Sequence, residues 1–354
     1  MLGDKTGAAS LTTSTRTSRG RRPGIRCGVC RGGDVPVRSA VALTAAAVLI
    51  VAGTTTFVDV VTTATSSSPA SIVFEREVAS GSQLFVGNPS GTGQRQLTFG
   101  PDTAEEPRWA PFGQRILYLR RPANDAHLPD LMVMGARGRH KQQLLAGGTT
   151  HFISDMAWSP SGRRIVLVRT LRSGFSDLFI YTPATETLLR MHVNREQRDP
   201  ATVDWASDGR IFFSAVDYTH DGDAFEDHDL YVVRPDGTGL TQLTDTPMRD
   251  ELLPRVAPDG RTLAFAQRST RCESVRIADT DSTGSVRLPT DCNAFEASWS
   301  ASGNRMLLQE FDGQGEFVIE IMAPDGTHRR FLTKGENADW RPSGPRGHPR
   351  PRTQ

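Results

Sequence analysis

The sequence predicts an all-β fold, a six-bladed β-propeller with four-stranded blades, on the strength of three observations. A short turn recurs six times, with neighbouring copies 41 to 51 residues apart. We call its first position the slot, and Trp occupies it in five of the six copies. Short stretches of alternating polarity accompany these turns and read as half-buried strands. The strands missing from the first repeat could be supplied by the last one, so the two ends of the repeat region could together form one blade. Repeats of this length with four short strands are typical of propeller blades.

Each copy of the turn has glycine four residues after the slot, as in Trp158-Ser-Pro-Ser-Gly. Glycine accepts the positive φ that tight hairpin turns require. All five Trp of the chain lie in this slot, so we interpret them as blade-packing residues. The six slot positions are Trp109, Trp158, Trp205, Val256, Trp299 and Trp340. An apolar alternation follows at 115–119, 164–168, 210–214, 262–266 and 305–309 and predicts the next strand.

A second series supplies the other two strands of each blade. Segments such as DLYVV at 229–233 lead into a turn with Pro-Asp-Gly or a variant of it, and a short strand then ends near Leu-Thr. The leading strands lie at 130–134, 177–181, 229–233 and 316–320, and the closing ones at 94–98, 141–145, 241–244 and 330–333.

The two ends of the repeat region predict how the ring closes. The first unit begins with an unaccompanied strand at 71–75, and no strand follows the last turn, at Trp340. A C-terminal inner strand ending at Trp340 would complete a blade with N-terminal strands near 71–78, 83–87 and 94–98. Such pairing leaves no open sheet edge and sets the blade number at six.

The slot-turn and Asp-Leu-Tyr-Val patterns together resemble the TolB-type propeller repeat, a relative of WD repeats. The resemblance runs from about Ser71 to Gly344. That family includes periplasmic scaffold proteins of the Tol envelope system, and the same propeller caps serine peptidases and occurs in metal-dependent lyases. Residues 1–70 cannot form the small α/β domain that precedes the propeller in the scaffold protein. The resemblance therefore implies the propeller, at 71–341, and not the Tol role.

The N-terminal region predicts a membrane tether. Residues 1–38 form a basic head, an apolar run at 40–58 is about as long as a bilayer-spanning helix, and 62–70 is a polar linker. The basic flank places the head in the cytoplasm, so we expect a single-pass signal anchor at 39–61 and an extracytoplasmic propeller. A cleaved signal peptide, which would release a secreted propeller, is the alternative. Residues 342–354 read as a disordered Pro/Arg tail.

Two cysteines fall in links predicted on one face of the propeller. Cys272 follows one strand and Cys292 precedes the strand that ends at Trp299. An extracytoplasmic setting permits a disulfide between them, and two free thiols are the alternative.

One long acidic segment, at 217–229, links two strands of blade four. Clustered carboxylates suit a hard cation such as Ca²⁺, although the spacing is not that of an EF-hand. The candidate metal ligands are Asp217, Asp221, Asp223, Glu226, Asp227 and Asp229. A solvated loop without a ligand and a docking surface for a basic partner are the alternatives.

Further charged residues mark a candidate binding face on the same side of the ring. Carboxylates at the starts of inner strands would form an acidic funnel that attracts a cationic peptide or ligand, or would simply meet water at strand ends. They are Glu105, Glu106, Asp155, Asp250, Glu251 and Glu296. The histidines predicted at this face are His127, His151, His192, His220 and His228.

The sequence lacks the motifs of several enzyme classes, including the nucleophile elbow, the P-loop and the zinc-protease motif. We therefore expect a non-enzymatic scaffold that needs no cofactor and binds an envelope protein, a peptide or a ligand through this face. A metal-dependent lyase or hydrolase at the channel mouth is the alternative. The acidic excess of residues 71–340 argues against nucleic acid as a partner. We expect a monomeric propeller.

Overall fold

A computed structural model gives the fold. It describes residues 71–342 except 124–127, 149–150, 172–173, 194–197, 218–226, 282–283, 289 and 291. The expected head, anchor and linker and the tail from 343 onward lie outside the described residues. Within the described ranges, no helix is long and apolar enough to cross a membrane.

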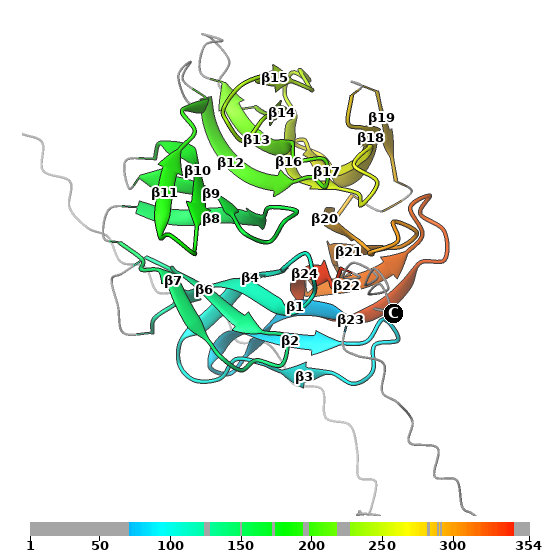
Figure 1. Cartoon of the computed structure of the whole chain (residues 1–354). Coiled ribbons are helices and arrows are strands. Elements are labelled where there is room, and N and C mark those ends of the chain that lie inside the picture. Colours follow the sequence, from blue (N-terminus) through cyan, green and yellow to red (C-terminus); the bar gives the residue numbers. More distant parts are fainter. Residues whose placement is uncertain are drawn as a thin grey trace, which may run out of the picture. The chain divides into compact units, whose positions relative to one another are not determined.

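Six four-stranded antiparallel sheets surround a central axis (Figure 1). Blade one holds β24 (Glu336–Trp340), β1 (Ile72–Val78), β2 (Gly81–Gly87) and β3 (Arg95–Gln96), and blade two holds β4 (Thr103–Trp109), β5 (Arg115–Arg121), β6 (Asp130–Gly135) and β7 (Gln142–Leu145). Blade three holds β8 (His151–Trp158), β9 (Ile165–Leu171), β10 (Ser176–Thr182) and β11 (Thr187–Arg190), and blade four holds β12 (Arg198–Trp205), β13 (Ile211–Asp217), β14 (His228–Val233) and β15 (Thr241–Gln242). Blade five holds β16 (Asp250–Val256), β17 (Thr262–Arg268), β18 (Glu273–Asp279) and β19 (Ser285–Arg287), and blade six holds β20 (Ala294–Trp299), β21 (Met306–Phe311), β22 (Phe317–Met322) and β23 (Arg330–Lys334). The predicted six-bladed, four-stranded propeller is confirmed.

Ring closure follows the predicted route. The last strand, β24, pairs antiparallel with β1, with Trp340 opposite Ile72. The backbone N–H of Arg341 donates to the carbonyl of Ser71 at 2.7 Å. Gly335 makes the turn into β24 at a φ of +140°, where an added Cβ would lie 2.4 Å from the carbonyl oxygen of Glu75. Only glycine fits this junction.

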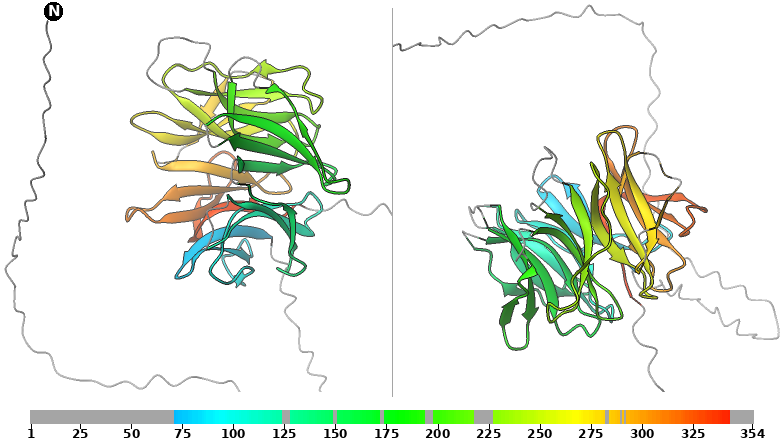
Figure 2. Two further views of the ribbon diagram at one scale, coloured as in Figure 1. Left: turned by 90° about the vertical axis from the view of Figure 1, so that its left-hand side faces the viewer. Right: turned by 90° about the horizontal axis from the view of Figure 1, so that it is seen from above.

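The hydrophobic core lies between the blades. Six clusters of buried residues form, one at each junction of neighbouring sheets. Trp205, for example, packs with Leu178 of blade three, and Trp158 packs with Leu117 of blade two. All five indoles are at most 9% exposed. Each blade therefore buries its apolar faces against its neighbours, and Figure 2 shows the blades from two further directions.

The two ends of the ring differ in their connections. We call the end at which the inner strands begin the link face, because it carries the links between blades. The end at which the inner strands finish is the turn face, because it carries the six slot turns.

Candidate functional site

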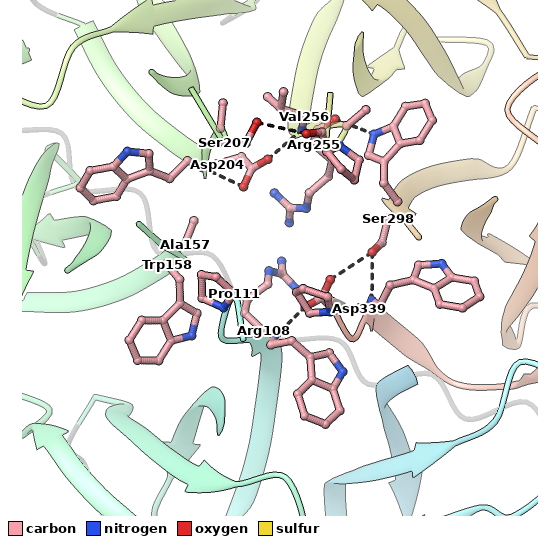
Figure 3. Close-up of a pocket in the computed structure, with 18 of the residues that line it drawn as sticks. Arg108, Pro111, Ala157, Trp158, Asp204, Ser207, Arg255, Val256, Ser298 and Asp339 are labelled. Atoms are coloured by element: carbon pink, nitrogen blue, oxygen red, sulfur yellow. Dashed lines mark hydrogen bonds between the residues drawn. The ribbon is translucent and has the colours of Figure 1, made fainter. Parts of the chain in front are cut away.

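The described part of the chain has a cavity of about 390 Å³ at the turn face, on the ring axis. Each of the six inner strands contributes to its wall (Figure 3). Because the six strands run in the same direction, equivalent positions form rings around the axis. Two such rings, together with the slot residues, account for most of the lining.

The rim of the cavity comes from the position two residues after each slot. Four of its six members are proline, whose fixed φ makes a stiff apolar edge. The rim residues are Pro111, Pro160, Ser207, Pro258, Ala301 and Pro342.

The floor comes from the position directly before each slot. Around the axis it reads Arg, Ala, Asp, Arg, Ser, Asp, so the pattern nearly repeats after three blades. Arg108 and Arg255 therefore lie on opposite sides of the ring, and their guanidinium groups point toward one another (Figure 3). The floor residues are Arg108, Ala157, Asp204, Arg255, Ser298 and Asp339.

The two arginines share two carboxylates that come from deeper positions. Arg108 Nη2 lies 3.4 Å from Glu296 Oε1 and 3.6 Å from Asp155 Oδ1. Arg255 Nη2 lies 2.9 Å from the same Glu296 oxygen, and its Nη1 lies 3.8 Å from Asp155 Oδ2. Both arginine side chains are only 10% exposed. Each charge is therefore compensated inside the channel, as buried charges require.

The floor also ties successive blades together. Asp204 Oδ2 accepts a hydrogen bond from the backbone N–H of Val256 at 2.7 Å, in the slot of the next blade. Asp339 Oδ2 accepts one from Trp109 N–H at 2.6 Å in the same way. The backbone N–H of Trp340 donates to Ser298 Oγ at 3.3 Å.

Burial governs the protonation of the central carboxyls. Desolvation raises the pKa of Glu106 to about 8, although Arg108 opposes the shift. Desolvation likewise raises the pKa of Asp339 to about 6 and that of Asp204 above its usual range. These three carboxyls therefore bind a proton more readily than exposed carboxyls do.

The link face has a different character. Carboxylates crowd the start of β24, where desolvation and the neighbouring Glu75 and Glu296 raise the pKa of Glu336 to about 7. Among the described residues, nine large hydrophobic side chains are exposed, and five of them lie in links or strand ends of this face. These five, which we call the apolar rim of the link face, are Phe99, Leu171, Phe175, Met248 and Phe311.

The structure places the predicted binding-face carboxylates at different depths. Glu105, Glu106 and Asp250 are half-buried, whereas Asp155, Glu251 and Glu296 are at most 4% exposed. The alternative that all six simply meet water at strand ends therefore does not hold for these three. A bulge turns Asp155 and Glu296 toward the arginines, and the alternation of the strand alone does not indicate this.

The predicted histidines do not gather at one point among the described residues. His228 Nδ1 lies 2.9 Å from Asp250 Oδ1. His151 begins β8, and His192 is exposed before β12. His127 and His220 lie outside the described residues.

Most of the predicted metal loop also lies outside the described residues, namely Asp221, Asp223 and Glu226, together with the side chain of Asp217. Asp227 accepts a hydrogen bond from Met248 N–H, and Asp229 accepts from Gln242 and Thr244. Desolvation raises the pKa of Asp229 to about 6. The described residues contain no group of three or more side chains suited to hold a metal ion, and the Ca²⁺ site stays a prediction.

A disulfide joins Cys272 and Cys292, whose Cα atoms are 4.6 Å apart. It ties the link between β17 and β18 to the link before β20. An isolated bridge between Glu273 and Asn293 lies beside it.

Sequence reasoning missed Arg108 and Arg255, because it considered the slot and not the position before it. A signal was present, however. The six residues before the slots repeat Arg and Asp after three blades, and such a repeat in a ring places like residues opposite each other.

This ring of six four-stranded blades has the fold of a TolB-like β-propeller. Among solved structures, TolB from Acinetobacter baumannii is similar with a TM-score of 0.65 and 16% identity, over 77% of this chain and 67% of that one. A putative TolB from Agrobacterium tumefaciens gives 0.55 and 17%, over 76% and 91%. An oligogalacturonate lyase from Vibrio parahaemolyticus gives 0.52 and 13%, over 75% and 74%. At these identities the likeness shows the fold alone, and one fold serves both binding and catalysis.

No family model matches the chain. One curated relative, dipeptidyl-peptidase 5 of Porphyromonas endodontalis, is 31% identical over 90 residues, which make up 25% of this chain. That segment spans only 12% of the peptidase.

Proposed function

We propose that this protein is an extracytoplasmic binding scaffold, tethered by the apolar segment at 39–61, which docks a protein partner on its link face. The apolar rim of the link face carries the proposal. Exposed apolar side chains that gather on one face, rather than scatter singly, are typical of interaction surfaces.

Charge indicates the kind of partner. The pKa of Glu336, at the start of β24, is raised by the negative charges of three nearby carboxylates. They are Glu75, Glu77 and Glu105. A basic partner would relieve this repulsion, because an opposite charge favours the ionised carboxylate. The expected occupant is therefore a protein surface with apolar side chains beside Lys or Arg.

Site-specific photocrosslinking in native envelopes tests this proposal. A photoreactive residue replaces Phe99 or Phe175 on the link face, and Leu189 or Phe331 on the outer strands β11 and β23 serves as the matched control. All four side chains are 57–70% exposed in the native protein, so exposure alone does not separate the two sets.

We expect one protein to crosslink from both link-face positions and from neither control. Raised salt should reduce the yield, because screening weakens the attraction between exposed charges. Equal crosslinking from all four positions, or a partner whose contact surface is acidic, would overturn the proposal.

A further inference from the structure

The cavity at the turn face plays no part in docking at the opposite end of the ring, yet its wall combines aromatic, charged and polar side chains. The indole N–H groups of Trp109, Trp158 and Trp340 are buried and have no acceptor in the described part of the chain. The other two indoles are satisfied, since Trp205 donates to the carbonyl of Gly209 and Trp299 to that of Arg255. All five line the cavity.

The floor arginines offer hydrogen-bond donors at the cavity. Arg108 and Arg255 use their terminal nitrogens on carboxylates and backbone carbonyls. Neither Nε has an acceptor among the described residues. Buried donors normally find partners, and a guest in the cavity would supply them.

The floor also offers acceptors beside these donors. Each carboxylate oxygen of Asp204 and Asp339 accepts one hydrogen bond from the protein. A carboxylate oxygen has two lone pairs, so each can accept one more. Because Arg and Asp alternate around the floor, a group that both accepts and donates fits it best.

Charge disfavours an anionic guest. Arg108 and Arg255 are already shared by Asp155 and Glu296, and Asp204 and Asp339 add further carboxyls. A carboxylate or phosphate would meet like charges at short range in a site of low dielectric. A neutral group meets no such repulsion.

We propose that the turn-face cavity binds a small neutral ligand through a secondary amide group, whose carbonyl accepts from Arg108 or Arg255 and whose N–H donates to Asp204 or Asp339. The proline rim packs against the apolar remainder of the ligand. Both acetylated amino sugars and short blocked peptides carry this group, and the cavity size suits either. The site is independent of the proposed docking at the link face.

The five indole signals give a direct test by ¹⁵N NMR of the full-length protein, assigned with single Trp→Phe variants. The probes are N-acetylglucosamine and N-acetylglycine N-methylamide, with glucose and acetate as matched compounds that lack the amide. We expect an amide probe, unlike the matched compounds, to shift indole signals, because all five Trp residues line the cavity. Shifts with N-acetylglucosamine alone would indicate an amino-sugar ligand, and shifts with the blocked glycine alone would indicate a peptide ligand.

A variant that narrows the mouth completes the test. Ala301→Phe places a bulky ring on the cavity rim, and Ala184→Phe places the same ring on an exposed turn of blade three that does not line the cavity. We expect about tenfold weaker probe binding in the first variant only, a loss of roughly 1.4 kcal/mol. Equal shifts with acetate or glucose, or no shift with either amide, would overturn the proposal.

Discussion

Asp339 accepts a hydrogen bond from the backbone N–H of Trp109 at 2.6 Å, although 230 residues separate the two in the chain. The bond joins the last inner strand to the first complete blade. Asp204 holds the N–H of Val256 in the equivalent way three blades further on. Two aspartates thus fasten opposite sides of the ring.

Replacing this aspartate should loosen the ring. In Asp339→Ala, the N–H of Trp109 and the hydroxyl of Ser298 lose their acceptor. Each buried donor left unsatisfied costs about 1–3 kcal/mol. Chemical denaturation should show a lower free energy of unfolding, whereas the exposed turn variant Asp325→Ala should lose much less. Equal losses would show that the bond to Trp109 is unimportant.

Removing the closing strand should open the ring. A chain that ends after Gly335 lacks β24 and exposes the edge of β1, whose first three residues are buried in the intact ring. Unpaired apolar edges promote association between chains. Size-exclusion chromatography should find aggregates, while a chain ending after Pro342 should elute as the full-length protein does. A monodisperse, folded product without β24 would contradict the closure.

The disulfide should stabilise the link face. Cys272 and Cys292 are 20 residues apart in sequence, and cross-linking a loop of this length stabilises a protein by about 3 kcal/mol in the chain-entropy model. The Cys272→Ser, Cys292→Ser double variant should melt at a lower temperature and should not respond to a reductant. The native protein should approach the same melting temperature when reduced. A melting temperature that neither change affects would refute the contribution of the bond.

Glu336 should make stability depend on pH. Its native pKa of about 7 exceeds the value of about 4.3 in an unfolded chain. The folded state thus binds more protons between these values, and stability falls as the pH rises through this window. Glu336→Gln removes the ionised group, so it should raise the melting temperature more at about pH 8 than at about pH 5. The exposed Glu186→Gln variant is the control, and an equal effect of Glu336→Gln at both pH values would argue against the shift.

The sequence determined the fold almost completely because each blade repeats the same local signals. Trp158, for example, marks a strand end, a turn and a packing position at once. The cavity floor could not be predicted as easily, since its chemistry arises between strands that are distant in the chain. Arg255, Glu296 and Asp155 come from blades five, six and three, and they meet only where these blades surround the axis. Periodicity along one strand does not carry this information.

The pairing of β1 with β24 also delays the completion of blade one during synthesis. Asn337 donates to Glu75 across 262 residues of chain, so the first strands leave the ribosome long before their partner exists. At the usual pace of roughly 5–20 residues per second, that interval is on the order of tens of seconds. The protein spends this time with an apolar edge uncovered. A holding chaperone during synthesis would therefore matter more for this chain than for one whose neighbouring strands are also neighbours in sequence.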